Sequence, residues 1–212
     1  MEMKLWTKPL GPLQTNGYVL DNGKGQGIII DPGMYPEEML DYVRHMSIEA
    51  ILLTHTHFDH IGGLEEVRRV TKAPVYLHPQ EADWLADAKK NGSARWPMVT
   101  APIICQPAEK KVQHGDSLEL AGFRLVVLHT PGHSPGSVSY YLAEEKLVFS
   151  GDALFAGSIG RTDLPGGDYH TLIKSIKEYL FTLPEETIVY PGHGPQTTVG
   201  EEKKYNPFLR GS

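Results

Sequence analysis

Five histidines and two aspartates of this chain lie where imidazole and carboxylate groups could bind metal ions. The densest group is the run from Thr54 to His60, THTHFDH, which places four potential ligands within six residues. Zn²⁺, Mn²⁺ and Fe²⁺ all accept imidazole and carboxylate ligands, and a set without cysteine does not separate these three ions. The spacing therefore indicates a metal site, with Zn²⁺ as the first expectation.

The run follows an apolar segment, residues 50–54, and precedes a helical pattern. If His55 and His57 continue an extended backbone, they project to the same side, because side chains of a strand alternate with a period of two. The chain must then turn to start the helix, which would bring Asp59 and His60 round toward a second position. We expect two adjacent metal positions.

Three further candidates repeat this setting at the ends of predicted strands. His133 lies in TPGHSPGS, Asp152 follows LVFSG, and His193 follows IVYPG. In α/β sheets, ligands collect at such strand ends. One carboxylate can bridge two ions, a role that we assign to Asp152, and two ions roughly 3.5–4 Å apart can share a hydroxide and polarise a substrate oxygen. A single histidine of this kind would be read as an ordinary turn residue, but the seven together predict hydrolytic chemistry.

Other polar residues receive structural or open interpretations. Asp31, in the turn DPG, could orient a metal histidine or cap a turn, and both interpretations stay open. The glycine-rich segment 157–168 lacks the GK[ST] ending of a phosphate loop, and we expect a salt bridge between Arg161 and Asp163 within it. The remaining histidines are predicted to be structural or surface residues: His45, His78, His114, His129 and His170.

The composition favours a small-molecule enzyme. The 212 residues carry a net charge of −6 without a basic cluster longer than a pair, which disfavours nucleic acid as a partner. No apolar run approaches the roughly 20 residues of a membrane span, so no membrane association is expected. The N-terminus lacks a signal-peptide pattern, and Cys105 is the one cysteine, expected to be a small buried hydrophobe. These features predict a cytoplasmic protein.

Short β-rich runs alternate with helical patterns in the first half, and consecutive strands dominate the second. The predicted strands are residues 18–20, 27–30, 50–54, 75–77, 117–120, 123–128, 137–142, 146–149 and 187–190. Four helices are predicted. The first begins at Pro36 and has the apolar stripe Met39, Leu40, Val43 and Met46, and the second turns Leu64, Val67 and Val70 inward. The third covers residues 81–88, and the fourth covers 168–181 with Leu172, Ile173, Ile176 and Leu180 on one face, whereas the tail NPFLRGS is expected to be irregular. We expect an α/β fold with two mixed sheets and helices on their outer faces, formed by residues 1–212 as a single domain.

The motifs, in their order, resemble those of the metallo-beta-lactamase superfamily. THTHFDHIGG is similar to its HxHxDH signature, and TPGHSPGS, SGDALF and YPGHGP are similar to the segments that supply its other ligands. The resemblance implies the αββα sandwich of the metallo-beta-lactamase fold. It also implies that His55, His57 and His133 hold one ion, that Asp59, His60 and His193 hold the other, and that Asp152 bridges them.

Within the superfamily the chain resembles the short bacterial members of the glyoxalase II branch, the hydroxyacylglutathione hydrolases, through GSIGRTDLPGGD and NPFL. The resemblance implies hydrolysis of a hydroxyacyl thioester by a hydroxide that bridges the two ions, with Asp59 and Asp152 holding it. The leaving thiol, with a pKa near 8.5, needs no strong general acid. Longer members carry a C-terminal helical domain, whereas only about twenty residues follow His193 here, too few for a domain.

Other activities share parts of this pattern. A mononuclear iron persulfide dioxygenase of the same fold would use His55, His133 and Asp152 and leave Asp59, His60 and His193 without metal. A lactonase or beta-lactamase would share all seven ligands, a nuclease is disfavoured by the acidic charge, and a non-catalytic metal-binding protein is the third class. The acyl group, the carrier thiol and the oligomeric state stay open. We also hypothesise that Tyr205, Asn206 and Phe208 pack beside the entrance of the site.

Overall fold

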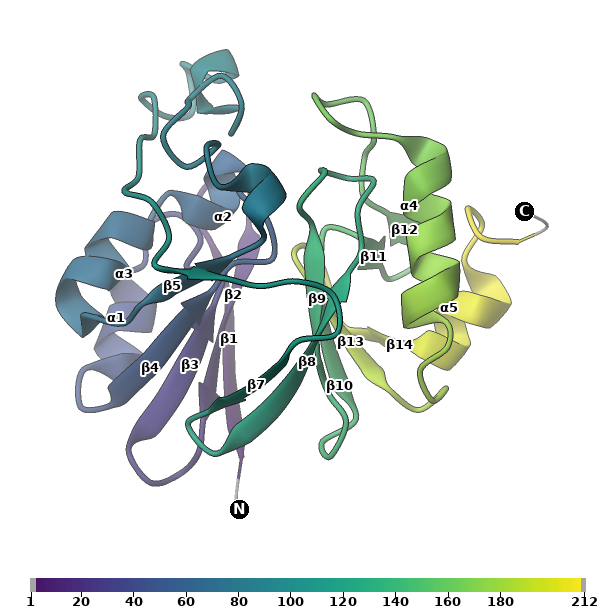
Figure 1. The fold of residues 1–212 in the computed structure, drawn as a ribbon, viewed down its shortest axis with the longest axis horizontal. Helices are drawn as coiled ribbons and strands as arrows, with labels where there is room; N and C mark the ends of the chain where they lie inside the picture. The colour runs from purple at the N-terminus through teal and green to yellow at the C-terminus, as the bar shows by residue number, and fades with distance from the viewer. Residues whose placement is uncertain (1–2, 211–212) are drawn as a thin grey trace. The chain divides into compact units, whose positions relative to one another are not determined.

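The structure is a computed structural model that describes residues 3–210 (Figure 1). The chain divides into two compact units. The first runs up to Val112 and includes Glu119–Phe123, and the second contains Gln113–Leu118 and the chain from Arg124 onward. Each unit is described by itself.

The first unit is built on a mixed sheet with the strand order β1-β2-β3-β4-β5-β6. Its strands are β1 (Lys4–Leu10), β2 (Thr15–Asp21), β3 (Gln26–Ile30), β4 (Ser47–Leu52), β5 (Val75–Leu77) and β6 (Lys110–Lys111). The first three strands pair antiparallel, and β3, β4, β5 and β6 pair parallel. The parallel strands end at the same edge, which is where the HxHxDH run begins.

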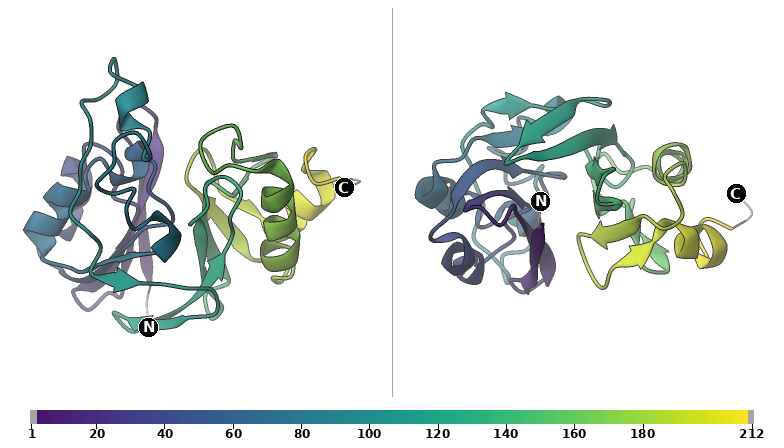
Figure 2. Two further views of the ribbon diagram at one scale, coloured as in Figure 1. Left: turned by 45° about the horizontal axis from the view of Figure 1, so that its top comes forward. Right: turned by 90° about the horizontal axis from the view of Figure 1, so that it is seen from below.

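The helices of this unit are α1 (Glu37–Val43), α2 (Phe58–Ile61) and α3 (Leu64–Thr71), with the 3-10 turns η1 (Pro79–Glu81) and η2 (Ser93–Arg95). Met39 of α1 and Leu64 of α3 share one buried cluster with Val19, Ile29 and Ile51 of the sheet. The paired positions Val19, Ile29 and Ile51 lie on one face of the sheet, so α1 and α3 cover that face. The blue helices beside the sheet can be followed in Figure 2.

The second unit is built on the sheet with the order β14-β13-β10-β9-β8-β7, of which only Glu119–Phe123, at the end of β7 and the start of β8, belong to the first unit. Its strands are β7 (Ser117–Leu120), β8 (Phe123–His129), β9 (Val138–Leu142), β10 (Leu147–Gly151), β13 (Ile188–Pro191) and β14 (Thr197–Thr198), and a hairpin of β11 (Leu154–Phe155) and β12 (Ser158–Ile159) follows β10. Strands β10 and β13 pair parallel, whereas β8, β9 and β10 pair antiparallel. This sheet is therefore also mixed.

Two helical segments pack on this sheet, α4 (Tyr169–Ser175) continued by a π-helical turn (Ile176–Leu180), and α5 (Val199–Tyr205). Asp168 caps α4, because its carboxylate accepts the Thr171 N–H at 2.7 Å. The predicted stripe of this helix is buried, and Leu172, Ile176 and Leu180 lie in one cluster with Val148 and Val189 of the sheet. The amphipathic pattern of residues 168–181 thus describes the helix correctly.

The predicted fold class, α/β with two mixed sheets and helices, is confirmed. Two local predictions are wrong. Val70 is 47% exposed, because a helix advances about 100° per residue and Val70 stands about 120° away from Leu64. Residues 81–88 form no α-helix. In addition, the structure contains the helix α5, for which the sequence analysis makes no prediction. The single-domain organisation stays a prediction.

The segment after η1 is held in turns instead of a helix. Its backbone hydrogen bonds connect residues three apart, as in Trp84 N–H to Glu81 O and Asp87 N–H to Trp84 O. The side chain of Asn91 donates to Trp84 O at 3.2 Å and to Ile103 O at 2.9 Å. Such side-chain bonds compete with the helical ladder for the same carbonyls.

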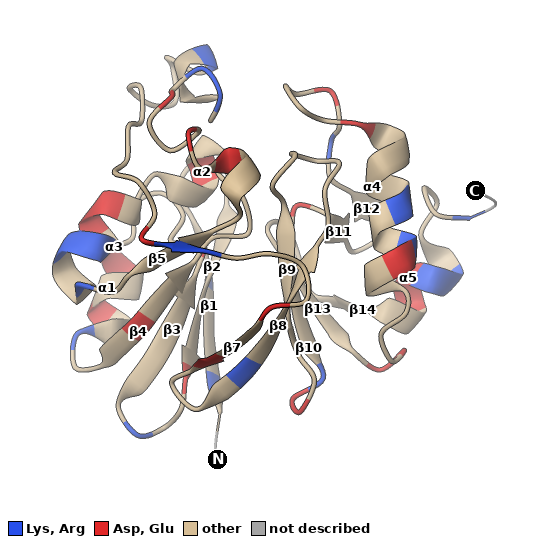
Figure 3. Cartoon of the chain, in the orientation of Figure 1, with Lys and Arg blue, Asp and Glu red and all other residues tan. Residues whose placement is uncertain are grey.

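Helices α3 and α5 each carry charges of both signs (Figure 3). Helix α3 carries Glu65, Glu66, Arg68 and Arg69, and α5 carries two acidic and two basic residues. Among residues 3–210, no helix has the length and apolarity needed to cross a membrane. The absence of nucleic-acid partners and the cytoplasmic location stay predictions.

Candidate metal centre

The HxHxDH run of the first unit brings its histidine rings together. The chain leaves β4 at Leu52, and α2 begins at Phe58, so His55 and His57 lie on the connecting segment. The ring centroids of His55 and His57 are 4.8 Å apart, and those of His55 and His60 are 4.1 Å apart. All three side chains are buried. The expectation that His55 and His57 face the same side agrees with this arrangement.

Asp59 lies beside His60 in the first turn of α2. Asp59 Oδ2 is 3.5 Å from His60 Nε2. The hydroxyl of Thr15, at the start of β2, donates a hydrogen bond of 2.6 Å to the same carboxylate oxygen. Thr15 is fully buried. This contact fixes the orientation of the Asp59 carboxylate, and no sequence pattern pointed to it.

Asp31 orients His60. Its Oδ2 lies 2.9 Å from His60 Nδ1 and accepts the Thr54 hydroxyl at 2.5 Å, while its Oδ1 accepts the Thr54 N–H at 2.8 Å. Asp31 follows β3 with a φ of +48°, a left-handed conformation that aspartate tolerates better than most residues. Of the two interpretations left open for Asp31, the structure supports the orienting one. Asp31, His55 and His60 lie close enough to form a ligand group, but these hydrogen bonds occupy both Asp31 oxygens.

The second unit contains the other three candidate ligands. Asp152 follows β10 and His193 follows β13, and these parallel neighbours end side by side. The Nε2 atoms of His133 and His193 each lie 3.5 Å from Asp152 Oδ2. Asp152 therefore stands between two imidazoles, and its bridging role stays a prediction.

His133 is held through its other ring nitrogen. Its Nδ1 is 2.8 Å from the main-chain carbonyl oxygen of Arg161, which leaves Nε2 facing Asp152. Metal-binding histidines typically donate their second N–H to a carboxylate or a carbonyl in this way. His60 and His133 both have such a partner. The role of the Arg161 carbonyl could not be read from the sequence, because a main-chain oxygen has no residue signature.

The loop that supplies this carbonyl is closely packed and internally paired. A Cβ atom added to Gly160 would lie 1.8 Å from Asp152 O and 3.1 Å from His133 Nδ1. The Arg161 guanidinium donates two hydrogen bonds of 2.7 Å to Asp163, which confirms the predicted salt bridge. This pairing raises the pKa of Arg161 and lowers the pKa of Asp163 to about 2.

The donor chemistry fits divalent metal ions. Three of the histidine–aspartate distances are 3.5 Å, longer than a charge-assisted hydrogen bond. Two atoms that each lie about 2.0–2.1 Å from a tetrahedral Zn²⁺ are about 3.4 Å apart. Within each unit the candidate ligands thus have the spacing of groups that share an ion.

The C-terminal segment contacts the hairpin that follows Asp152. The Asn206 side chain is buried and donates to Ser158 O at 3.0 Å and to Glu202 Oε2 at 2.7 Å. Tyr205 and Phe208 are exposed. The hypothesis that this segment lies beside the site entrance stays a prediction. Truncation after Gly200 would remove the buried hydrogen bonds of Asn206.

The other five histidines have local contacts. His78 accepts the Gln80 N–H, the His129 ring lies 2.9 Å from Pro135 O, and the His114 ring packs on Tyr179. His45 and His170 are exposed. These contacts match the structural and surface roles expected of the five.

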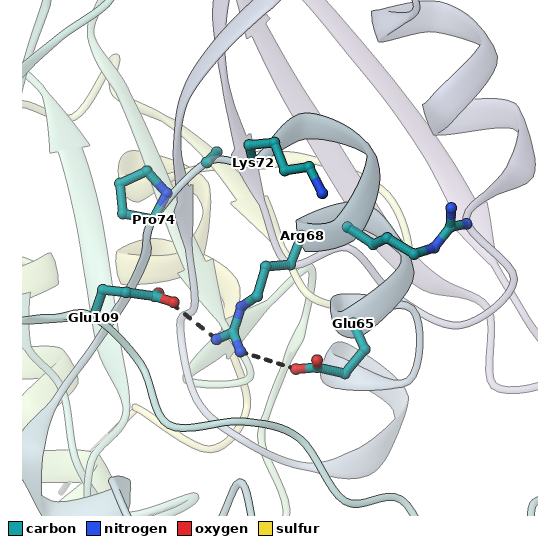
Figure 4. A pocket seen from close by; sticks show the side chains of 7 residues that line it. Glu65, Arg68, Lys72, Pro74 and Glu109 are labelled. Atoms are coloured by element: carbon teal, nitrogen blue, oxygen red, sulfur yellow. Dashed lines mark hydrogen bonds and ion pairs between the residues drawn. The ribbon is translucent and has the colours of Figure 1, made fainter.

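A surface pocket of about 400 Å³ on the first unit does not resemble a reaction site (Figure 4). Arg68 of α3 lies between Glu65 at 3.0 Å and Glu109 at 3.8 Å, so its charge is neutralised inside the pocket. Arg68 also donates to Pro107 O at 3.2 Å. These contacts attach α3 to the segment before β6, which is a structural role.

Comparison with known proteins identifies the family. The metallo-beta-lactamase superfamily model matches residues 10–193. The probable metallo-hydrolase YqgX of Bacillus subtilis is 50% identical over 99% of both chains. The hydroxyacylglutathione hydrolase GloC of Haemophilus influenzae is 34% identical over 95% of both chains.

Solved structures show the same fold. BLEG-1, described as a B3 metallo-beta-lactamase, is 49% identical with a TM-score of 0.94, over 98% of this chain and 100% of that one. TTHA1623 in a di-iron-bound form is 44% identical with a TM-score of 0.84, over 96% and 100%. ETHE1 from Myxococcus xanthus is 31% identical with a TM-score of 0.78, over 100% and 86%.

Proposed function

Since this chain belongs to the metallo-beta-lactamase superfamily, we propose that it is a binuclear metal-dependent hydrolase that cleaves thioesters of hydroxyacyl thiols. The observation that supports a thioester as the substrate is the 34% identity to a hydroxyacylglutathione hydrolase over nearly the full length of both chains. A small-molecule thioester is thus the proposed substrate.

The proposed ligands are the seven residues named from the sequence. His55, His57 and His133 would hold one ion, Asp59, His60 and His193 would hold the other, and Asp152 would be shared by both. The histidine–aspartate distances of 3.5 Å within each unit support this assignment. Zn²⁺ is the first expectation, and Fe²⁺ or Mn²⁺ suits the same donors. One relative of known structure is a di-iron form, which supports keeping iron as a candidate.

The bound ions would activate a water molecule and polarise the thioester carbonyl oxygen. Side chains of the protein orient the residues that would bind the ions and the water. Thr15 keeps one Asp59 oxygen in place, and Asp31 holds His60 so that Nε2 points toward Asp59. Asp59 and Asp152 are the proposed catalytic carboxylates, which accept hydrogen bonds from the attacking water and orient it. The thiol leaves as a thiolate, because its ordinary pKa is near 8.5, and no protein acid is required.

The test combines metal content with hydrolysis of S-D-lactoylglutathione on protein purified without chelator or added metal. We expect two ions per chain and turnover. His193→Ala should remove one ion and lower kcat/KM by about 100-fold or more, because electrostatic stabilisation is lost. His170→Ala, a change at an exposed histidine, is the matched control and should leave both quantities unchanged. One iron per chain, with oxygen uptake on a persulfide and no thioester cleavage, would replace this proposal by the dioxygenase.

A second candidate is a beta-lactamase activity, favoured by the 49% identity to BLEG-1. It would use the same ligands with an amide of a strained ring in place of a thioester. A chromogenic cephalosporin, assayed on the same sample, separates the two. A kcat/KM for the cephalosporin above that for every hydroxyacyl thioester tested would make the lactam the preferred substrate.

A further inference from the structure

Two threonines alternate with the first two histidines of the metal-binding run, and each is held by a buried carboxylate. Thr54 donates its N–H and its hydroxyl to Asp31. Thr56 donates its N–H and its hydroxyl to Glu81 Oε2, both at 2.7 Å. The Thr54 hydroxyl also lies 3.1 Å from His55 Nδ1. Each carboxylate thus fixes the backbone next to a proposed ligand.

Glu81 is unusual because it is a fully buried carboxylate far from Thr56 in sequence. It ends the short turn η1, is 0% exposed and stands 25 residues after Thr56. Burying a carboxylate is costly unless it accepts good hydrogen bonds. Glu81 was not among the residues singled out from the sequence, and the proposed chemistry does not use it directly.

The segment from Glu81 to Asn91 contacts three consecutive residues of the metal-binding run, namely Thr56, His57 and Phe58. Glu81 accepts from Thr56, the Trp84 ring centroid lies 6.2 Å from that of His57, and Asn91 O accepts the Phe58 N–H at 2.9 Å. These contacts all belong to the first unit. The segment therefore holds the backbone on both sides of His57.

We propose that Glu81 is a positioning residue for metal binding, which acts through Thr56. By clamping both donors of Thr56, it fixes the peptide between His55 and His57 and with it the 4.8 Å separation of their rings. Without this clamp the segment can rotate, and the two imidazoles no longer present one arrangement of nitrogens to an ion. This inference rests on the metal ligands of the proposed function and not on its substrate.

The experiment measures Zn²⁺ affinity by competition with a chromophoric chelator and the absorption spectrum of the Co²⁺-loaded protein. Glu81→Ala and Thr56→Val should each weaken the binding of one ion by about 10–100-fold, the usual effect of losing a hydrogen-bonded partner of a ligand. Both should alter the Co²⁺ spectrum, which reports coordination geometry.

Conservative variants separate positioning from loss of structure. Thr56→Ser keeps the hydroxyl, and Glu81→Gln keeps an oxygen that can accept both bonds, so both should bind Zn²⁺ within a few-fold of the wild type. The double variant Glu81→Ala/Thr56→Val should be no weaker than the weaker single variant, because both changes break the same clamp. If Glu81→Ala does not fold, Thr56→Val compared with Thr56→Ser decides the question.

The proposal is overturned if Thr56→Val binds Zn²⁺ as tightly as Thr56→Ser with an unchanged Co²⁺ spectrum, even where the apo-protein melts at a lower temperature. It is also overturned if Glu81→Gln weakens binding as much as Glu81→Ala. Absence of thioester hydrolysis in a wild-type protein that binds two ions would contradict the proposed substrate and leave the role of Glu81 intact.

Discussion

Gly160 leaves no space for a side chain, and a substitution there should displace a proposed metal ligand. A Cβ atom would lie 1.8 Å from the Asp152 carbonyl oxygen. An ordinary contact is about 3.4 Å, so the two backbones must separate by roughly 1.5 Å in Gly160→Ala. The same Cβ would lie 3.1 Å from His133 Nδ1. Both Asp152 and His133 are proposed ligands.

The expected magnitudes follow from this overlap. Forcing one extra methyl into a filled space typically costs about 1–3 kcal/mol, which is roughly 3–10 °C in Tm for a chain of this size. A displacement of about 1 Å in a reacting group can cost roughly 100-fold in rate. We therefore expect Gly160→Ala to lower Tm by several degrees, to weaken metal binding and to lower kcat/KM by about 100-fold.

The assay is thermal unfolding, metal content and hydrolysis on the same preparations, with Gly157→Ala as the control. Gly157 lies in the same loop with a φ of +67° and no atom within 4 Å of an added Cβ, so its substitution should cost about 1 kcal/mol of backbone strain without moving Asp152. If Gly160→Ala matches Gly157→Ala in metal content and kcat/KM, the steric reasoning is refuted.

Three further outcomes follow from single contacts. Thr15→Val removes the 2.6 Å hydrogen bond to Asp59 and should lower kcat/KM by about tenfold or more, whereas unchanged kinetics and metal affinity would show that Asp59 needs no such support. The Asp163 carboxyl, whose pKa is lowered to about 2 chiefly by its hydrogen bond from Arg161, should titrate near pH 2 in NMR. Because the folded pKa is depressed, the stabilisation from this pair is present above the ordinary value of 3.8 and is lost as the pH falls toward 2; a midpoint near 3.8 would contradict the pairing. Burial raises the pKa of the Cys105 thiol to about 12, so an aromatic disulfide reagent at pH 8 should modify it only after denaturation, and rapid reaction of the native protein would contradict its burial.

Local patterns explain why much of the fold could be predicted. The stripe of residues 168–181 and the strand runs depend on side chains within a few positions of one another, so the sequence displays them directly. Residues 81–88 have a helical composition, yet Asn91 competes for the Trp84 carbonyl and the segment folds as turns. Asn91 lies outside the predicted helix, so the pattern of residues 81–88 does not indicate this competition.

The family, the mixed α/β fold and the candidate ligands can be predicted from the amino-acid sequence, because imidazoles and carboxylates at strand ends are visible as residue types in order. Tertiary structure decided which groups hold those ligands. Thr15 reaches Asp59 across 44 positions, Glu81 reaches Thr56 across 25, and the Arg161 carbonyl reaches His133 across 28. Nothing local marks these partners, since a hydrogen bond depends on where two distant segments meet, and only the folded backbone sets that distance.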